Sequence, residues 1–211
     1  MREKIVKVYK FAELSEEAQQ AVIERRQQSN GEFFDGADCV YDDACTIAEL
    51  FGLEIAARYW KNSHGFEGST PTIYYSGFSS QGDGACFEGS YRYKKGALRA
   101  VKEYASQDTE LHSIVEALQR AQAANFYKVV ATCKHSGHYY HSGCMEVSVE
   151  HADDSYRDVK NEDDFIQALR EFADWIYSRL ESAYDYETSE ENAREYLENG
   201  DAEYTADGEE A

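Results

Sequence analysis

The chain has 211 residues, with 41 acidic and 21 basic side chains and a formal net charge of −20. This excess of acidic side chains disfavours direct binding to nucleic-acid phosphates, which needs clustered Lys and Arg. A hydrophobic share of 42%, including 14% aromatic residues, excludes a disordered acidic chain. No apolar run reaches the length of about 18 residues that a membrane-spanning helix needs.

The ends of the chain and its cysteines indicate a compartment. The segment Met1 to Lys4 carries mixed charges and leads into no long apolar stretch, so no signal peptide is expected. The five cysteines are odd in number and irregularly spaced, which is typical of reduced thiols. We therefore predict a cytoplasmic protein.

The first quarter of the chain predicts a strand, two helices and a second strand. A strand is expected over 5–9. Ser15 caps a helix over about 16–28, which the run Ser-Asn-Gly at 29–31 ends. A second helix over about 38–51 presents an apolar stripe, and a strand follows at 53–55.

The middle of the chain changes from helical to strand periodicity. Residues 72–78 and 86–93 are rich in aromatic residues and flank a polar, Gly-rich loop, which predicts a β-hairpin. Helices are expected over about 96–105 and 109–124.

A second hairpin and two helices complete the chain. The hairpin joins 126–135 to 138–150 through a tight turn at Ser136-Gly137, and helices are expected over about 162–184 and 189–197. The predicted fold class is α+β, with an antiparallel sheet of four or more strands that includes two hairpins packed with helices. Residues 1–184 are expected to form one domain, and 185–211 an acidic helix with a tail disordered from Gly200.

The loop of the first hairpin is the most distinctive polar segment. Its glycines permit positive φ and close backbone approach, and its hydroxyl, amide and carboxylate groups can bind a ligand or a partner. It lacks the lysine of a phosphate-binding Walker loop. A long structural turn and a recognition loop both remain open for Ser79, Ser80, Gln81, Gly82, Asp83 and Gly84.

The turn of the second hairpin is rich in histidine. A tight turn would place His135 beside His138 as cross-strand neighbours. Three interpretations remain open: a polar face of stacked rings, a zinc site that would draw on the flanking cysteines, and a histidine acting as general base. We predict a binding role for His135, His138, Tyr139 and His141, with no metal, no cofactor and no catalytic residue assigned.

Three segments resemble a group of small phage and mobile-element proteins that often carry the label of antitoxin in toxin–antitoxin systems. They are 7–18, 75–85 and 135–141, and the resemblance covers about 5–180. It implies a phage or plasmid setting, and the host cell's cytoplasm if a phage encodes the protein. Counter-defence proteins and acidic mimics of nucleic acid are common in that setting. The resemblance brings no catalytic residues with it.

Charge and resemblance together favour a binding protein over an enzyme without deciding the question. The first hypothesis is an inhibitor of a host defence or nucleic-acid-handling complex, which binds a basic protein surface and possesses no direct affinity for nucleic acid or membrane. The second is a binder or hydrolase of a small, nucleotide-like ligand that uses both loops. The third is an antitoxin that neutralises a basic toxin. The oligomeric state is left open.

Overall fold

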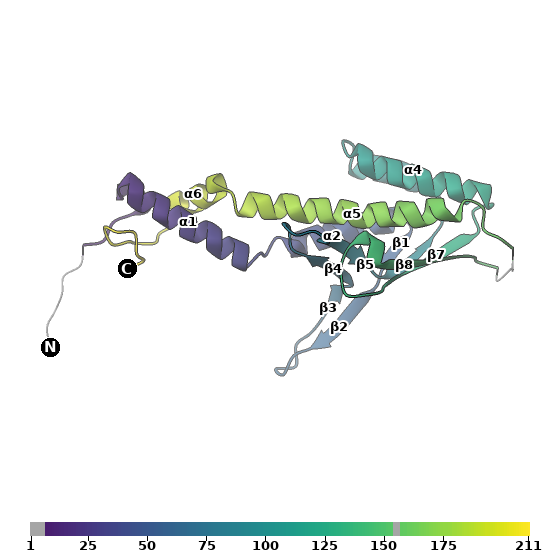
Figure 1. Cartoon of the computed structure of the whole chain (residues 1–211), viewed down its shortest axis with the longest axis horizontal. Helices are drawn as coiled ribbons and strands as arrows, with labels where there is room; N and C mark the ends of the chain where they lie inside the picture. The colour runs from purple at the N-terminus through teal and green to yellow at the C-terminus, as the bar shows by residue number, and fades with distance from the viewer. Residues whose placement is uncertain (1–6, 154–156) are drawn as a thin grey trace. The chain divides into compact units, whose positions relative to one another are not determined.

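The computed structural model describes residues 7–153 and 157–211, and these residues fall into two compact units (Figure 1). One unit contains the described residues up to Ala37 together with Leu180–Ala211, and the other is Asp38–Arg179. Part of the strand expected at 5–9 lies outside the described residues. Within the described part, Tyr9 forms an antiparallel bridge with Tyr204.

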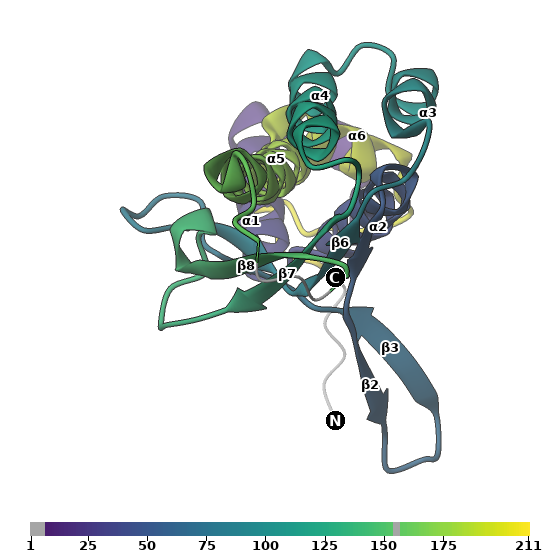
Figure 2. The ribbon, with the colours of Figure 1, turned by 90° about the vertical axis from the view of Figure 1, so that its right-hand side faces the viewer.

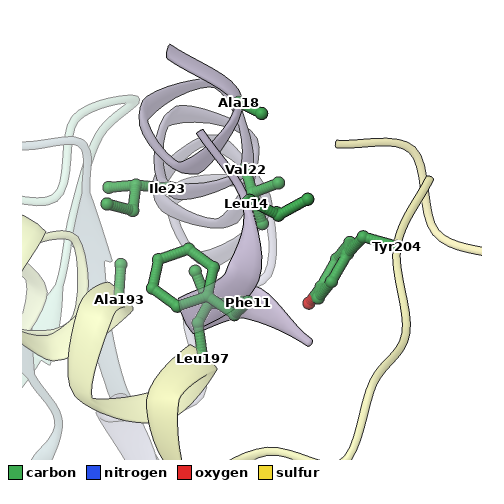
Figure 3. Packing of buried hydrophobic residues seen from close by; sticks show 8 residues of the cluster. All are labelled: Phe11, Leu14, Ala18, Val22, Ile23, Ala193, Leu197 and Tyr204. Carbon is green, nitrogen blue, oxygen red and sulfur yellow. The ribbon is translucent and has the colours of Figure 1, made fainter. Parts of the chain in front are cut away.

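The first unit is a small helical cluster. It contains the 3₁₀ turn η1 (Phe11–Glu13) and the helices α1 (Glu16–Glu32) and α6 (Glu190–Asn199). The hydroxyl of Ser15 accepts a hydrogen bond from the Ala18 N–H, as the sequence predicts for a helix cap. Figure 3 shows the buried side chains that hold the unit together, which are Phe11, Leu14, Ala18, Val22, Ile23, Ala193, Leu197 and Tyr204.

Helix α1 continues past the Ser-Asn-Gly run at 29–31, so the expected helix end there is wrong. The reason is tertiary. The side-chain amide of Gln27 donates to the Thr188 carbonyl at 2.8 Å, and that of Asn30 donates to the Glu187 carbonyl at 2.7 Å. These contacts hold the last turn in a helical conformation against the weak helix propensity of its residues.

The last residues of the chain fold back onto this unit, whereas their composition predicts a disordered tail from Gly200. Tyr204 is only 6% exposed, and its backbone exchanges two hydrogen bonds with Tyr9 at 2.8 and 2.9 Å. Arg25 donates to the Gly208 carbonyl at 2.8 Å. One buried ring and a few backbone bonds hold this segment, which belongs to the same compact unit as α1.

The second unit is built on an antiparallel sheet, which confirms the α+β class. Its four strands lie in the order β1-β6-β7-β8. Two two-stranded sheets accompany it, β4 with β5 and β2 with β3. The bounds of the sheet strands are β1 (Leu53–Ile55), β6 (Gly89–Arg92), β7 (Val129–His135) and β8 (Met145–His151), and those of the smaller sheets are β2 (Ala57–Lys61), β3 (Glu67–Pro71), β4 (Ile73–Ser76) and β5 (Gly84–Phe87).

Helices cover one face of this sheet. The described helices of the unit are α2 (Ala37–Phe51), α3 (Ala97–Tyr104), α4 (Thr109–Ala124) and α5 (Glu162–Glu187), whose last turns belong to the first unit. Phe172 of α5 lies at the centre of the core, with ring centroids 5.0 Å from Phe51 and 5.8 Å from Phe87. Trp175 is buried beside it and donates to an Asp108 carboxylate oxygen at 2.8 Å.

Two features of the second unit differ from the sequence expectation. The run 86–93 is divided at Glu88 between β5 and β6, which belong to different sheets. The hairpin of β2 and β3 was not among the predicted elements, and Figures 1 and 2 show it extending away from the sheet and the helices of its unit. Within residues 7–153 and 157–211, no helix combines the length and hydropathy that a bilayer-spanning segment needs.

Candidate functional site

The Gly-rich loop connects β4 to β5 and is closed by its own aspartate. The Asp83 carboxylate accepts hydrogen bonds from the backbone N–H groups of Ser79 and Ser80 at 3.0 and 2.6 Å. Gly77 and Gly82 have positive φ, as the turn requires. The side chains of Ser79, Ser80 and Gln81 are exposed and free to meet a partner, while Asp83 supports the turn.

The His-rich segment is a longer loop than the expected tight turn, and that expectation is wrong. His135 pairs with Met145, so β8 begins seven residues later than predicted. The loop between them contains a 3₁₀ turn at Ser142–Cys144. His138 is therefore exposed in the loop and is not the cross-strand neighbour of His135. The loop is held by the Ser136 N–H, which donates to the Cys144 carbonyl at 2.8 Å.

The fold brings the two predicted loops into contact. A methyl group added to Gly84 would lie 2.6 Å from the His141 Cβ atom, and one added to Gly82 would lie 3.8 Å from the Tyr139 ring. The hydrogen at Gly84 is what allows the close approach there, whereas 3.8 Å at Gly82 is an ordinary van der Waals distance. The predicted site residues thus form one loop cluster, defined as 79–84 together with 135–141, at one end of the sheet.

Side-chain rings fill the interior of the loop cluster. Tyr74 stacks on Tyr140 with centroids 5.4 Å apart, and His135 lies 5.4 Å from Tyr74 and 5.1 Å from Tyr140. The Arg58 guanidinium lies over the Tyr74 ring at 5.7 Å. His135 is therefore a packed ring, which agrees with the stacked-face interpretation of this segment.

The ring nitrogens of His141, which is half-buried, are occupied within the loop. His141 accepts from the Gly143 N–H through Nδ1 at 3.1 Å, and its Nε2 lies 3.5 Å from the Cys144 sulfur. Cys133 is 1% exposed within β7. In the described part of the chain, no three His, Cys, Asp or Glu side chains converge as a metal site, so the zinc interpretation lacks its ligands there.

Cys86, which follows the Gly-rich loop in β5, is a poor nucleophile. Burial, followed by the nearby Cys144 and Glu88 side chains, raises the pKa of the Cys86 thiol to about 12. A thiol with that pKa stays protonated at neutral pH, and the thiolate is the form that attacks substrates or binds metals. The loop cluster can therefore bind a ligand through its exposed hydroxyls and rings, but Cys86 supplies no nucleophile.

A second candidate surface was missed by the sequence analysis. The hairpin of β2 and β3, here called the arm (57–71), exposes every residue of β2. Three large aromatic side chains are exposed on it: Tyr59 at 83%, Phe66 at 70% and Trp60 at 48%. Soluble proteins rarely leave such a group uncovered unless it contacts a partner.

The sequence does contain a signal for the arm. Residues 57–61 are rich in strand-forming side chains, Asn62 to Gly65 is a turn sequence, and a polar strand follows at 67–71. The exposure of its aromatic residues has no such signal, since aromatic strand residues are usually buried against a core. Only the structure shows that no described element covers them.

Comparison with known proteins gives a family but no activity. A family model described as Domain of unknown function (DUF8835) matches residues 37–190, which include the arm and both loops. No curated protein and no solved structure matches the chain. The family description names neither a phage nor a toxin–antitoxin setting, so that setting stays a prediction.

Proposed function

We propose that this chain, which belongs to the family Domain of unknown function (DUF8835), is a binding module that inserts its arm into a cleft of a basic partner protein. The observation that carries this proposal is the exposure of Tyr59, Trp60 and Phe66 on a hairpin that projects from its unit (Figure 2). Tyrosine and tryptophan are the residues that dominate the energetics of protein interfaces.

The arrangement of the aromatic residues favours a cleft over a flat surface. Tyr59 and Trp60 are consecutive in β2 and therefore point to opposite faces of the hairpin. Phe66 lies at the end of the turn. A flat partner could cover only one of these faces, whereas a cleft can enclose both faces and the end.

The arm is well ordered, so binding needs little rearrangement. The Asn62 side chain accepts from the N–H groups of His64 and Phe66, each at 3.0 Å, and Lys61 pairs with Glu67. Trp60 lies across Gly68, where an added methyl would come within 2.6 Å of the ring, and covers the bare backbone there. A preformed contact surface lowers the entropy cost of association.

The root of the arm is fixed to the rest of its unit. Ala56 donates to the Glu88 carbonyl at 2.8 Å, Glu88 to the Thr72 carbonyl at 2.9 Å, and Thr72 to the Ala56 carbonyl at 2.7 Å. This closed set of three backbone bonds joins the arm to β4 and β6. The root of the arm is therefore held in place by backbone hydrogen bonds.

Charge indicates the chemistry of the partner. The unit containing the two chain ends carries 19 acidic and 7 basic residues, for −12, and the other unit carries −8. Such a field attracts a basic surface and speeds its association. The resemblance to mobile-element proteins supports a host defence or nucleic-acid-handling protein, whose phosphate-binding surface is basic. The same charge would attract a basic toxin, so the antitoxin hypothesis differs only in the identity of the partner.

The test compares the wild-type chain with the triple variant Tyr59→Ala, Trp60→Ala, Phe66→Ala. Each is used as bait in host lysate at low and at high salt, and Tyr186→Ala, which removes an equally exposed ring elsewhere, is the control. We expect a basic protein that the wild type and Tyr186→Ala retain, that the triple variant loses, and that high salt releases.

Two results would contradict the proposal. One is a partner that the triple variant retains as well as the wild type does. The other is a concentration-dependent dimer of the purified chain, measured by sedimentation, that the triple variant abolishes. That outcome would identify the occupant of the arm as a second copy of the chain.

A second candidate function rests on the contact between the two predicted loops. Because Gly82 and Gly84 approach Tyr139 and His141, a small ligand placed on the exposed hydroxyls of Ser79 and Ser80 would also meet these rings. Tyr139→Ala tests it, since this change should weaken ligand binding and leave the capture of a basic protein unaffected.

A further inference from the structure

We propose that the sheet end opposite the loop cluster binds a small aromatic anion, with a phosphate or carboxylate group on a planar ring. At this end β6 finishes at Arg92, β7 begins at Val129 and β8 finishes at His151. The strands meet in register, since Arg92 pairs with Val130 and Val129 with His151. The site uses no residue of the arm or of the loop cluster.

The strand ends surround a hollow of about 390 Å³. This volume falls within the range of about 300–1,000 Å³ that is typical of small-molecule sites. Aromatic and charged side chains line it together, and the ones that matter for binding are Arg92, Tyr93, Tyr127, Lys128, Glu150 and His151.

Two cations on its wall give the hollow an affinity for anions. Among residues 7–153 and 157–211, no carboxylate lies within ion-pair distance of the Arg92 guanidinium. The Lys128 ammonium is 4.0 Å from an Asp153 carboxylate oxygen that lies only 2.9 Å from Arg157. On a chain of net charge −20, Arg92 and Lys128 therefore keep charge available for a ligand, and a guanidinium matches phosphate and carboxylate geometry. The Glu150 carboxylate on the same wall repels an anion and so favours its placement beside Arg92 and Lys128.

A histidine with an unpaired ring nitrogen also lines the hollow. His151 is 9% exposed, and among residues 7–153 and 157–211 its Nδ1 has no hydrogen-bond partner. Buried polar atoms almost always have a partner, because leaving one unpaired costs free energy. Because Nδ1 itself is shielded from solvent, an anionic ligand oxygen would accept from Nδ1–H after the imidazole turns toward the hollow.

The aromatic wall is held in a strained conformation. Phe126 and Tyr127 have φ values of 55° and 61°, a region that bulky residues seldom occupy. The buried Gln122 side chain maintains it by donating to the Val129 carbonyl at 2.7 Å. The strain presents Tyr127 against Tyr93, with ring centroids 4.5 Å apart. Gly or Asn would adopt this φ at a lower cost, so the two aromatic residues are held here against the backbone's preference.

The experiment titrates the full chain with phenyl phosphate, benzoate and inorganic phosphate, and follows amide chemical shifts. We expect saturable shifts at the sheet end with phenyl phosphate or benzoate, and the tighter of the two identifies the anionic group. Arg92→Gln and Lys128→Gln should each weaken that binding about tenfold, because each removes a charge-assisted hydrogen bond. Lys134→Gln, the same charge change at the other end of β7, should leave it unchanged.

A further variant separates binding from folding. Tyr127→Gly relieves the positive φ, so its melting midpoint should stay within a few degrees of the wild type while its affinity falls about tenfold or more. Three results would overturn the proposal: no saturable binding of either aromatic anion, an equal loss in Lys134→Gln and Arg92→Gln, or inorganic phosphate binding as tightly as phenyl phosphate.

Discussion

Two hairpins follow one another along this chain and lie in opposite environments. In the arm, every residue of β2 is exposed, and in the next hairpin every residue of β5 is buried. Both are antiparallel pairs of four or five residues, and both contain aromatic strand residues and glycines. The backbone pairing is thus the same, and what differs is whether another element covers the faces.

The difference teaches how to separate aromatic residues that stabilise the fold from those available to a partner. Phe87 in β5 is 0% exposed and contacts Phe172, so its burial stabilises the unit. Tyr59 in β2 is 83% exposed, so its ring buries far less surface and contributes far less to the stability of the unit than Phe87 does. The arm therefore presents Tyr59, Trp60 and Phe66 to solvent, whereas Phe87 is part of the core.

The largest effect is expected at alkaline pH, where three buried acids of the sheet region act together. Burial raises the pKa of Cys86 and Cys133 from 9.0 to about 12 and that of Tyr91 from 10.0 to about 12. As pH rises above 9, the unfolded chain releases these protons first. The free energy of unfolding should therefore be intact below pH 9 and fall steadily toward pH 12.

This pH dependence can be assigned to the buried region and not to the arm. The chain has two tryptophans, Trp60 in the arm and Trp175 in the core. In Trp60→Phe, fluorescence during urea unfolding reports on Trp175 alone. Cys133→Ala should lose less stability over the same pH range, and a flat profile between pH 9 and 12 would contradict the assignment.

A truncation in each hairpin should give the next largest contrast. Phe87→Ala removes a fully buried ring and should reduce the free energy of unfolding by about 3–5 kcal/mol. Phe66→Ala removes an exposed ring of the same size and should change it by less than about 0.5 kcal/mol. Urea unfolding followed by far-UV circular dichroism measures both, and equal losses would show that the arm also belongs to the core.

A methyl group added to one glycine in each hairpin sharpens the comparison. In Gly84→Ala the new atom lies 2.6 Å from the His141 Cβ and 2.9 Å from its Cα, so the loop itself must shift, at a cost of about 1–3 kcal/mol. In Gly68→Ala the three atoms nearest to the new one all belong to the Trp60 ring, which can swing into water. We expect a lower melting midpoint for Gly84→Ala and almost no change for Gly68→Ala. A larger drop for Gly68→Ala would reverse the ranking.

The smallest effects are expected in the Gly-rich loop. Asp83→Ala removes the acceptor of two backbone hydrogen bonds and should cost about 1–2 kcal/mol. The exposed changes Ser80→Ala and Gln81→Ala should each cost less than about 0.5 kcal/mol. If either of the latter weakens binding of a ligand or partner while the fold is kept, the loop is a recognition element. Unchanged binding in both would leave it a structural turn.

Local signals in the sequence were sufficient for most helices and for the fold class. The helix expected over 109–124 is α4 with the same bounds, and the first hairpin and its Gly-rich loop lie where the pattern of aromatic strands and glycines predicts them. These signals work because caps, apolar periodicity and turn residues act over a few positions. The structure brings the two predicted loops into contact, and their role in binding stays a prediction.

The predictions that failed depend on contacts between distant residues. Helix α1 passes through Ser29-Asn30-Gly31 because Asn30 reaches Glu187, and Tyr204 is ordered because Tyr9 lies beside it. The tight turn at Ser136-Gly137 was expected from its dipeptide alone, but the longer loop packs against Gly84. Composition reports none of these contacts.

The sequence by itself determined an acidic α+β chain with two polar loops, because charge, periodicity and turn chemistry are properties of neighbouring residues. Only the tertiary structure decided which aromatic residues are buried and which meet solvent. Phe87 and Tyr59 both occupy strands, and no local pattern separates them. Their exposure depends on whether α5 or another element covers the strand, and that is settled by how the whole unit packs.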